Sequence, residues 1–276
     1  MTETLYQPRT LGPLEAQVVA WMETERPQLV DSAAVAEALG WSQRTAQEAL
    51  LRLARKGWLT RTVAGRYEPL LGASGGWAVP NPWAALAAWR APHFVSFASA
   101  AYEHGLTPDR PGAVQTCVPT GRVRPKAWAQ LPIALVPVRA FALPGTEMAD
   151  LHDFTVRIAG VERTLVDCAT IPARAGGAFG LTRIVDRGLE RAEWDKFVEL
   201  ARALPRGRVA ARRIAAIADV LIRSVPQPLA EFATARPGEQ PLYLDGVSHG
   251  RRGERLPRWQ VVVNVPAEAL REEVER

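Results

Sequence analysis

The chain has 276 residues, which is enough for two domains of ordinary size, and 47% of them are hydrophobic. No run approaches the roughly 18 apolar residues of a membrane helix and the N-terminus has no apolar signal segment, so we expect a globular cytoplasmic protein with no membrane partner. The net charge of +5 favours an anionic partner only weakly, and Cys117 and Cys168, in no metal or redox spacing, predict buried apolar side chains.

The N-terminal third predicts two helices that lead into a tight turn. Apolar positions from Pro13 to Glu23 are typical of a first helix. Asp31 is a suitable N-cap for a second helix, and Gly40 supplies the permissive backbone at which that helix ends. Two helices in this order, with a glycine turn after the second, favour a helix-turn-helix.

A third helix and a hairpin follow the turn. Ser42 can cap the helix, and Gly57 ends it. The segments from Trp58 to Thr62 and from Arg66 to Pro69 can pair as short strands. The sequence therefore predicts a winged helix-turn-helix domain over residues 1–70.

Positive charge gathers on the parts of this domain that face DNA in a winged helix. Residues 42–67 carry six basic side chains against one acidic one, whereas residues 1–41 carry two against six. Such side chains bind the phosphate backbone and release counterions. In the third helix, we predict DNA contacts from Ser42, Gln43, Arg44, Thr45, Gln47 and Arg52. In the wing, we predict them from Arg61 and Arg66.

The remainder of the chain predicts a second, larger domain. Residues 71–82 are rich in Gly and Pro and are typical of a linker, which leaves 83–276 for this domain. Helices are expected at 82–90, 96–104, 162–169, 181–189, 192–203, 208–224 and 267–275. Strands are expected at 113–118, 133–139, 154–158, 242–245 and 259–264. Clustered helices mixed with strands indicate an α+β fold, so the predicted fold class is α+β throughout.

The second domain offers little catalytic chemistry. It has no phosphate-binding glycine loop, no nucleophile elbow and no Cys/His/Asp cluster with metal-ligand spacing. Glu162 and Asp167, five residues apart on a predicted helix, point to different faces and make a poor acid–base pair. We therefore expect no enzyme, no cofactor and no metal.

A second basic segment lies near residue 210. Arg206, Arg208, Arg212 and Arg213 alternate with apolar residues that include Ile214 and Ile217. That spacing predicts a helix that buries one face and exposes arginine on the other. Two interpretations remain open: an ordinary surface helix, or an anion-binding face for the DNA backbone or an acidic protein.

Three stretches resemble one known family. They are FVSFASAAYEHGLT (Phe94 to Thr107), GVERTLVDCA (Gly160 to Ala169) and RWQVVVN (Arg258 to Asn264). Together with the predicted winged helix, they make the whole chain similar to the AbiEi-type antitoxins of type IV toxin–antitoxin systems, which act in bacterial abortive infection.

The resemblance implies a transcriptional repressor that binds inverted repeats in its own promoter through the N-terminal domain. It also implies a C-terminal domain that neutralises a nucleotidyltransferase toxin without needing a stable complex with it. Two alternatives stay open: a stand-alone regulator whose second domain senses a ligand or a partner, and a nucleic-acid-processing enzyme that docks through its winged helix.

Overall fold

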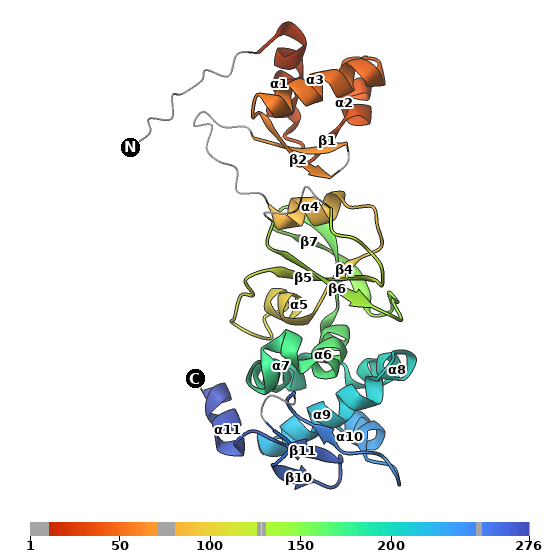
Figure 1. The fold of residues 1–276 in the computed structure, drawn as a ribbon, viewed down its shortest axis with the longest axis vertical. Helices are drawn as coiled ribbons and strands as arrows, with labels where there is room; N and C mark the ends of the chain where they lie inside the picture. The colour runs from red at the N-terminus through yellow and green to blue at the C-terminus, as the bar shows by residue number, and fades with distance from the viewer. Residues whose placement is uncertain are drawn as a thin grey trace, which may run out of the picture. The chain divides into compact units, whose positions relative to one another are not determined.

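The computed structural model describes residues 11–63, 65–70, 81–125, 128, 131–246 and 250–275. It forms two compact units (Figure 1). The first comprises Met1–Ala91, Val123–Ile133 and Asp150–Val156, and the second comprises the rest. Three segments expected in the second domain therefore group with the first. The predicted linker lies outside the described residues up to residue 80.

The first unit contains the predicted winged helix-turn-helix. Its helices are α1 (Pro13–Glu25), α2 (Ser32–Leu39) and α3 (Gln43–Arg55). Its strands are β1 (Val30–Asp31), β2 (Leu59–Val63) and β3 (Arg66–Pro69), which form an antiparallel sheet in the order β1-β3-β2. The two-residue strand β1 was not predicted, because a strand that short has no periodicity of its own.

Side-chain caps set the helix-turn-helix geometry as predicted. The carboxylate of Asp31 accepts hydrogen bonds from the backbone N–H groups of Ala33 and Ala34, at 3.1 and 3.0 Å. Gly40 closes α2 in the left-handed region, with φ 67°. The hydroxyl of Ser42 accepts from the N–H of Thr45 at 3.1 Å, which starts α3.

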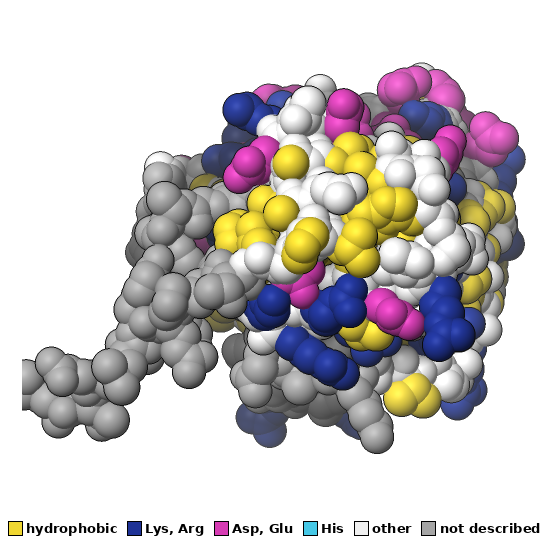
Figure 2. All heavy atoms as spheres, turned by 90° about the horizontal axis from the view of Figure 1, so that it is seen from above, with side chains coloured by type: hydrophobic (Ala, Val, Ile, Leu, Met, Phe, Trp, Pro, Cys, Tyr) yellow, Lys and Arg dark blue, Asp and Glu magenta, His cyan; other side chains and the backbone are white. Residues whose placement is uncertain are grey.

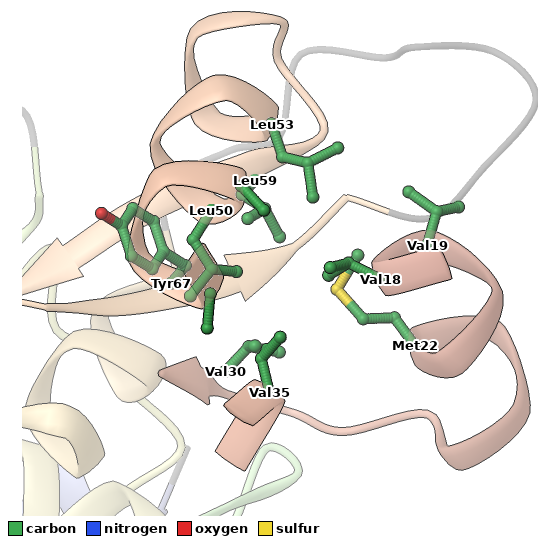
Figure 3. Close-up of a cluster of buried hydrophobic side chains, with 11 residues drawn as sticks. Val18, Val19, Met22, Val30, Val35, Leu50, Leu53, Leu59 and Tyr67 are labelled. Carbon is green, nitrogen blue, oxygen red and sulfur yellow. The ribbon is translucent and has the colours of Figure 1, made fainter. Parts of the chain in front are cut away.

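A single apolar cluster joins these elements. In Figure 3, Val18 and Met22 of α1 point toward the interior shared with Leu50 of α3. Val35 of α2 and Leu53 of α3 are also fully buried. Burying one such side chain contributes roughly 1.5–3 kcal/mol, so the cluster fixes which face of α3 points inward.

The wing strand β2 packs against residues that are distant in sequence. Trp128 is fully buried and its indole N–H donates to the carbonyl oxygen of Thr62 at 3.1 Å. Trp89, which follows helix α4 (Pro82–Ala88), makes an edge contact with Trp128, with ring centroids 4.8 Å apart. Helix α4 also contacts β2. Residues beyond position 80 therefore pack against the wing and stabilise it.

This packing predicts that a fragment ending near Gly76 has a loosened wing. Without Trp128 and α4, we expect the amides of residues 59–62 to exchange hydrogen at least about tenfold faster than in the full chain, which corresponds to about 1.4 kcal/mol of local stability. Hydrogen-exchange mass spectrometry of both proteins measures this. Equal protection would show that the hairpin is stable without these contacts.

A five-stranded sheet follows along the chain. Its order is β6-β5-β4-β8-β7, with β4 antiparallel to β5 and parallel to β8. The strands are β4 (Phe94–Val95), β5 (Val114–Pro119), β6 (Ile133–Val138), β7 (Thr146–Leu151) and β8 (Phe154–Ala159). Helix α5 (Phe97–Glu103) follows β4. Strands β4 and β7 were not predicted, since β4 is very short and β7 is an edge strand in which only half of the residues are apolar.

The second unit is mainly helical beyond residue 160. Its helices are α6 (Val161–Thr170), α7 (Gly177–Arg191), α8 (Trp194–Ala203), α9 (Gly207–Val220), α10 (Gln227–Ala233) and α11 (Ala267–Glu275). A 3-10 turn covers Pro172–Ala175, and β9 (Leu242–Tyr243), β11 (Val261–Val263) and β10 (Glu254–Leu256) form a small sheet. The elements α10 and β10 were not predicted.

Helix α9 is the centre of this unit. It contacts α6, α7, α8, α10 and α11 (Figure 1). It is rich in alanine, and Ala210, Ala211, Ala215, Ala216 and Ala218 are all fully buried. Small side chains let neighbouring helices approach on several sides, so α9 is a core helix and not the amphipathic surface helix that its sequence predicted.

Candidate nucleic-acid interface

Helix α3 presents a polar face opposite its buried residues. Ala46, Leu50 and Leu53 point into the core. Gln43, Arg44 and Gln47 are exposed in the first two turns, and of these Arg44 lies opposite the buried residues. The hydroxyls of Ser42 and Thr45 form a hydrogen bond with each other at 2.8 Å, so part of their hydrogen-bonding capacity is already used.

Arg44 is a highly accessible residue among those predicted to read bases. Its side chain is 88% exposed and its Nε lies 3.2 Å from a carboxylate oxygen of Glu48, one turn along the helix. An ion pair this exposed contributes little to stability, so its guanidinium is available to a ligand. Arginine and glutamine can each form two hydrogen bonds with a base edge in the major groove.

Arg52 lies on the flank of α3 and not on its outer face. Its Nε is 3.4 Å from a carboxylate oxygen of Glu15 in α1, and the ammonium of Lys56 is 2.5 Å from the other oxygen. Arg55 is instead exposed and, within the described part of the chain, makes no ion pair. Sequence reasoning missed Arg55, although its helical position, eleven residues after Arg44, could have found it.

The two wing arginines differ in their surroundings. Arg61 on β2 is exposed and has no ion-pair partner among the residues that the structure describes. Arg66 on β3 is 30% exposed, and its Nε lies 3.8 Å from a carboxylate oxygen of Asp31. Arg61 is therefore the freer of the two to contact a phosphate.

The interface remains basic after its internal pairs are counted. Residues 42–67 carry six basic side chains and Glu48, and the structure brings the carboxylates of Glu15 and Asp31 next to them. Six cationic side chains and three carboxylates give this region a net charge of +3. Figure 2 shows a band of Lys and Arg side chains, with some Asp and Glu side chains between them, beside neutral and hydrophobic surface.

The arginines predicted to form a second basic face do not form an exposed surface. Arg212 is 4% exposed. Its guanidinium donates to the carbonyl oxygens of Trp259, Gln240 and Gln260, at 2.6, 2.9 and 2.7 Å. The prediction of an exposed arginine here is wrong, because the side chain satisfies backbone carbonyls at the ends of the small sheet.

Arg213 and Arg208 are also used internally. Arg213 donates to the carbonyl oxygen of Ala169 at 2.8 Å, and burial lowers its pKa to about 10. Arg208 makes two 3.0 Å hydrogen bonds with Glu239, and these lower the pKa of that carboxyl to about 2. Of the four predicted residues, only Arg206 is exposed with no partner within the described chain.

Two of the stretches singled out in the sequence, Phe94 to Thr107 and Gly160 to Ala169, are in contact inside the second unit. Ser96 donates to Asp167 at 2.7 Å, and Asp167 also accepts from the Nε of Arg163 at 3.0 Å. Arg163 lies over the ring of Phe94, 4.8 Å from its centroid. These residues therefore hold β4 and α5 against α6, and their chemistry is structural.

The described residues offer no alternative site of metal or thiol chemistry. They contain no group of three His, Cys, Asp or Glu side chains that could hold a metal ion. Cys117 and Cys168 are buried free thiols, as predicted, and burial raises the pKa of both. The carboxylate of Glu162 accepts a hydrogen bond from the N–H of Glu193, whereas that of Asp167 accepts one from Ser96, so Glu162 and Asp167 do not form a pair.

None of the described helices is long and apolar enough to cross a membrane.

Comparison with known proteins identifies a solved structure with a similar fold. No family model matches the chain, and no curated protein sequence matches it. The crystal structure of the RV2827C protein from Mycobacterium tuberculosis is similar with a TM-score of 0.71, over 97% of each chain and at 20% identity. The two proteins therefore share a fold along nearly their whole length.

Proposed function

We propose that this protein is a sequence-specific DNA-binding transcriptional repressor that reads the major groove with α3. The observation that carries the proposal is the exposed face of α3, where Gln43, Arg44 and Gln47 stand clear of the core. Arg61 on the wing adds a cation suited to the phosphate backbone. We propose an inverted repeat in its own promoter as the target.

Selection from a pool of random duplexes tests this proposal. The full chain should enrich an inverted repeat, bind it as two copies, and bind the same sequence upstream of its own gene. Binding should weaken steeply with salt. Recovery of no sequence above background, at low and at physiological salt, would contradict a sequence-specific repressor.

The wing makes a separate prediction. Replacing Arg61 by glutamine should weaken binding to every duplex and lower the slope of log affinity against log salt by about one, because one phosphate contact is lost. Arg66→Gln should have a smaller effect, since Asp31 lies 3.8 Å from Arg66. Fluorescence anisotropy over a salt series measures both slopes, and an unchanged slope for Arg61→Gln would place the wing away from DNA.

We also propose, from the family resemblance, that the second unit neutralises a nucleotidyltransferase toxin. The support is that the two longer matching stretches pack together through Ser96, Arg163 and Asp167. Co-expression with a nucleotidyltransferase encoded beside the gene tests this, with growth rescue as the readout. Failure to rescue, with DNA binding intact, would favour a stand-alone regulator.

A further inference from the structure

Glu15 is a buried carboxylate at the first turn of α1. It is 3% exposed. One oxygen accepts from the N–H of Gly12 at 2.7 Å and from the ammonium of Lys56 at 2.5 Å. The other lies 3.4 Å from the Nε of Arg52. The hydrogen bond from Gly12, and then the one from Lys56, lower the pKa of Glu15, so the group is ionised at neutral pH.

Both cations lie at the C-terminal end of α3, the helix proposed to read the major groove. The side chains of Arg52 and Lys56 are 44% and 36% exposed. Unpaired, each could contact a phosphate and release a counterion. In this structure, both are instead paired with the carboxylate of Glu15.

We propose that Glu15 sets the strength of DNA binding, because it lowers the affinity for duplexes of any sequence by occupying Arg52 and Lys56. This inference rests on the proposed DNA-binding function. Cations that neutralise phosphates add affinity on every duplex, whereas base contacts add affinity only on the target. Pairing two cations with Glu15 therefore weakens target and non-target complexes by a similar factor.

Glu15→Gln is the direct test, because the glutamine carbonyl can still accept the hydrogen bond from Gly12. A capping box works with either residue, so the helix start is kept while the charge is lost. Glu37→Gln is the matched control. It makes the same change in net charge on α2, where Glu37 is exposed and makes no ion pair with a described residue.

The measurement is the salt dependence of binding of the full chain to a random-sequence duplex. Glu15→Gln should steepen the slope of log affinity against log salt by about one to two, one for each additional phosphate that the protein neutralises, and raise low-salt affinity at least about tenfold. Glu37→Gln should change the slope by well under one. The ratio of target to random-duplex affinity should stay nearly unchanged in Glu15→Gln, because both affinities rise together.

A second variant keeps the test independent of how well Glu15→Gln folds. Lys56→Gln in the otherwise unchanged protein should leave the random-duplex slope nearly unaltered, because Glu15 already neutralises Lys56. In the double variant Glu15→Gln/Lys56→Gln, the slope should be lower by about one than in Glu15→Gln alone. A flattening by about one in the unchanged background would overturn the inference.

The remaining outcomes separate this inference from the function on which it rests. Equal slopes for Glu15→Gln and Glu37→Gln, in a protein that still binds its target, would overturn the role of Glu15 and leave the repressor standing. Absence of binding by the unaltered protein to any duplex would overturn both.

Discussion

Replacing Arg212 by methionine should destabilise the second unit by about 3–5 kcal/mol, the typical effect of removing one partner from a buried charged network. The guanidinium is 4% exposed and donates to three carbonyl oxygens. Methionine can fill much of the volume but leaves these acceptors without a donor. Urea unfolding followed by circular dichroism measures the change in the free energy of unfolding.

Arg206→Met is the control for Arg212→Met. Arg206 precedes α9, is exposed and makes no ion pair within the described chain. Its replacement should change stability by less than about 0.5 kcal/mol. Two equally mild variants would mean that Arg212 is at the surface after all, and would restore the basic face predicted from the sequence.

Replacing Arg44 or Gln47 by alanine should cost roughly 1–3 kcal/mol of binding to the enriched target, or about 5- to 150-fold in affinity, with little effect on random DNA. The reason is that a bidentate contact to a base edge is lost only where the right base is present. Competitive anisotropy with both duplexes gives the two affinities under one salt condition.

The salt bridge of Arg44 calls for its own control. Arg44→Ala leaves Glu48 unpaired on the same face, where its carboxylate repels phosphates on any duplex. The double variant Arg44→Ala/Glu48→Gln removes that repulsion. If the double variant still loses affinity only on the target, Arg44 reads a base. Equal losses on both duplexes would show that Arg44 contacts a phosphate.

The sequence by itself determined most of the first unit. Asp31, Gly40 and Ser42 act within three or four residues of their own positions, so each helix end could be predicted from local chemistry. Helical periodicity likewise predicted which residues of α3 are buried. The exposed face with Arg44 and Gln47 follows directly from those two signals.

Tertiary structure alone decided which arginines are free. The sequence shows Arg52, Arg61, Arg208 and Arg212 as similar cations. Arg61 stays exposed, whereas the other three have partners that lie 24 to 48 residues away along the chain. A guanidinium can stay in solvent or satisfy distant acceptors equally well, and helical spacing carries no information about which acceptors folding brings near. For the same reason, the sequence could not predict that Trp128 packs against the wing, because Trp128 lies 66 residues from Thr62 along the chain.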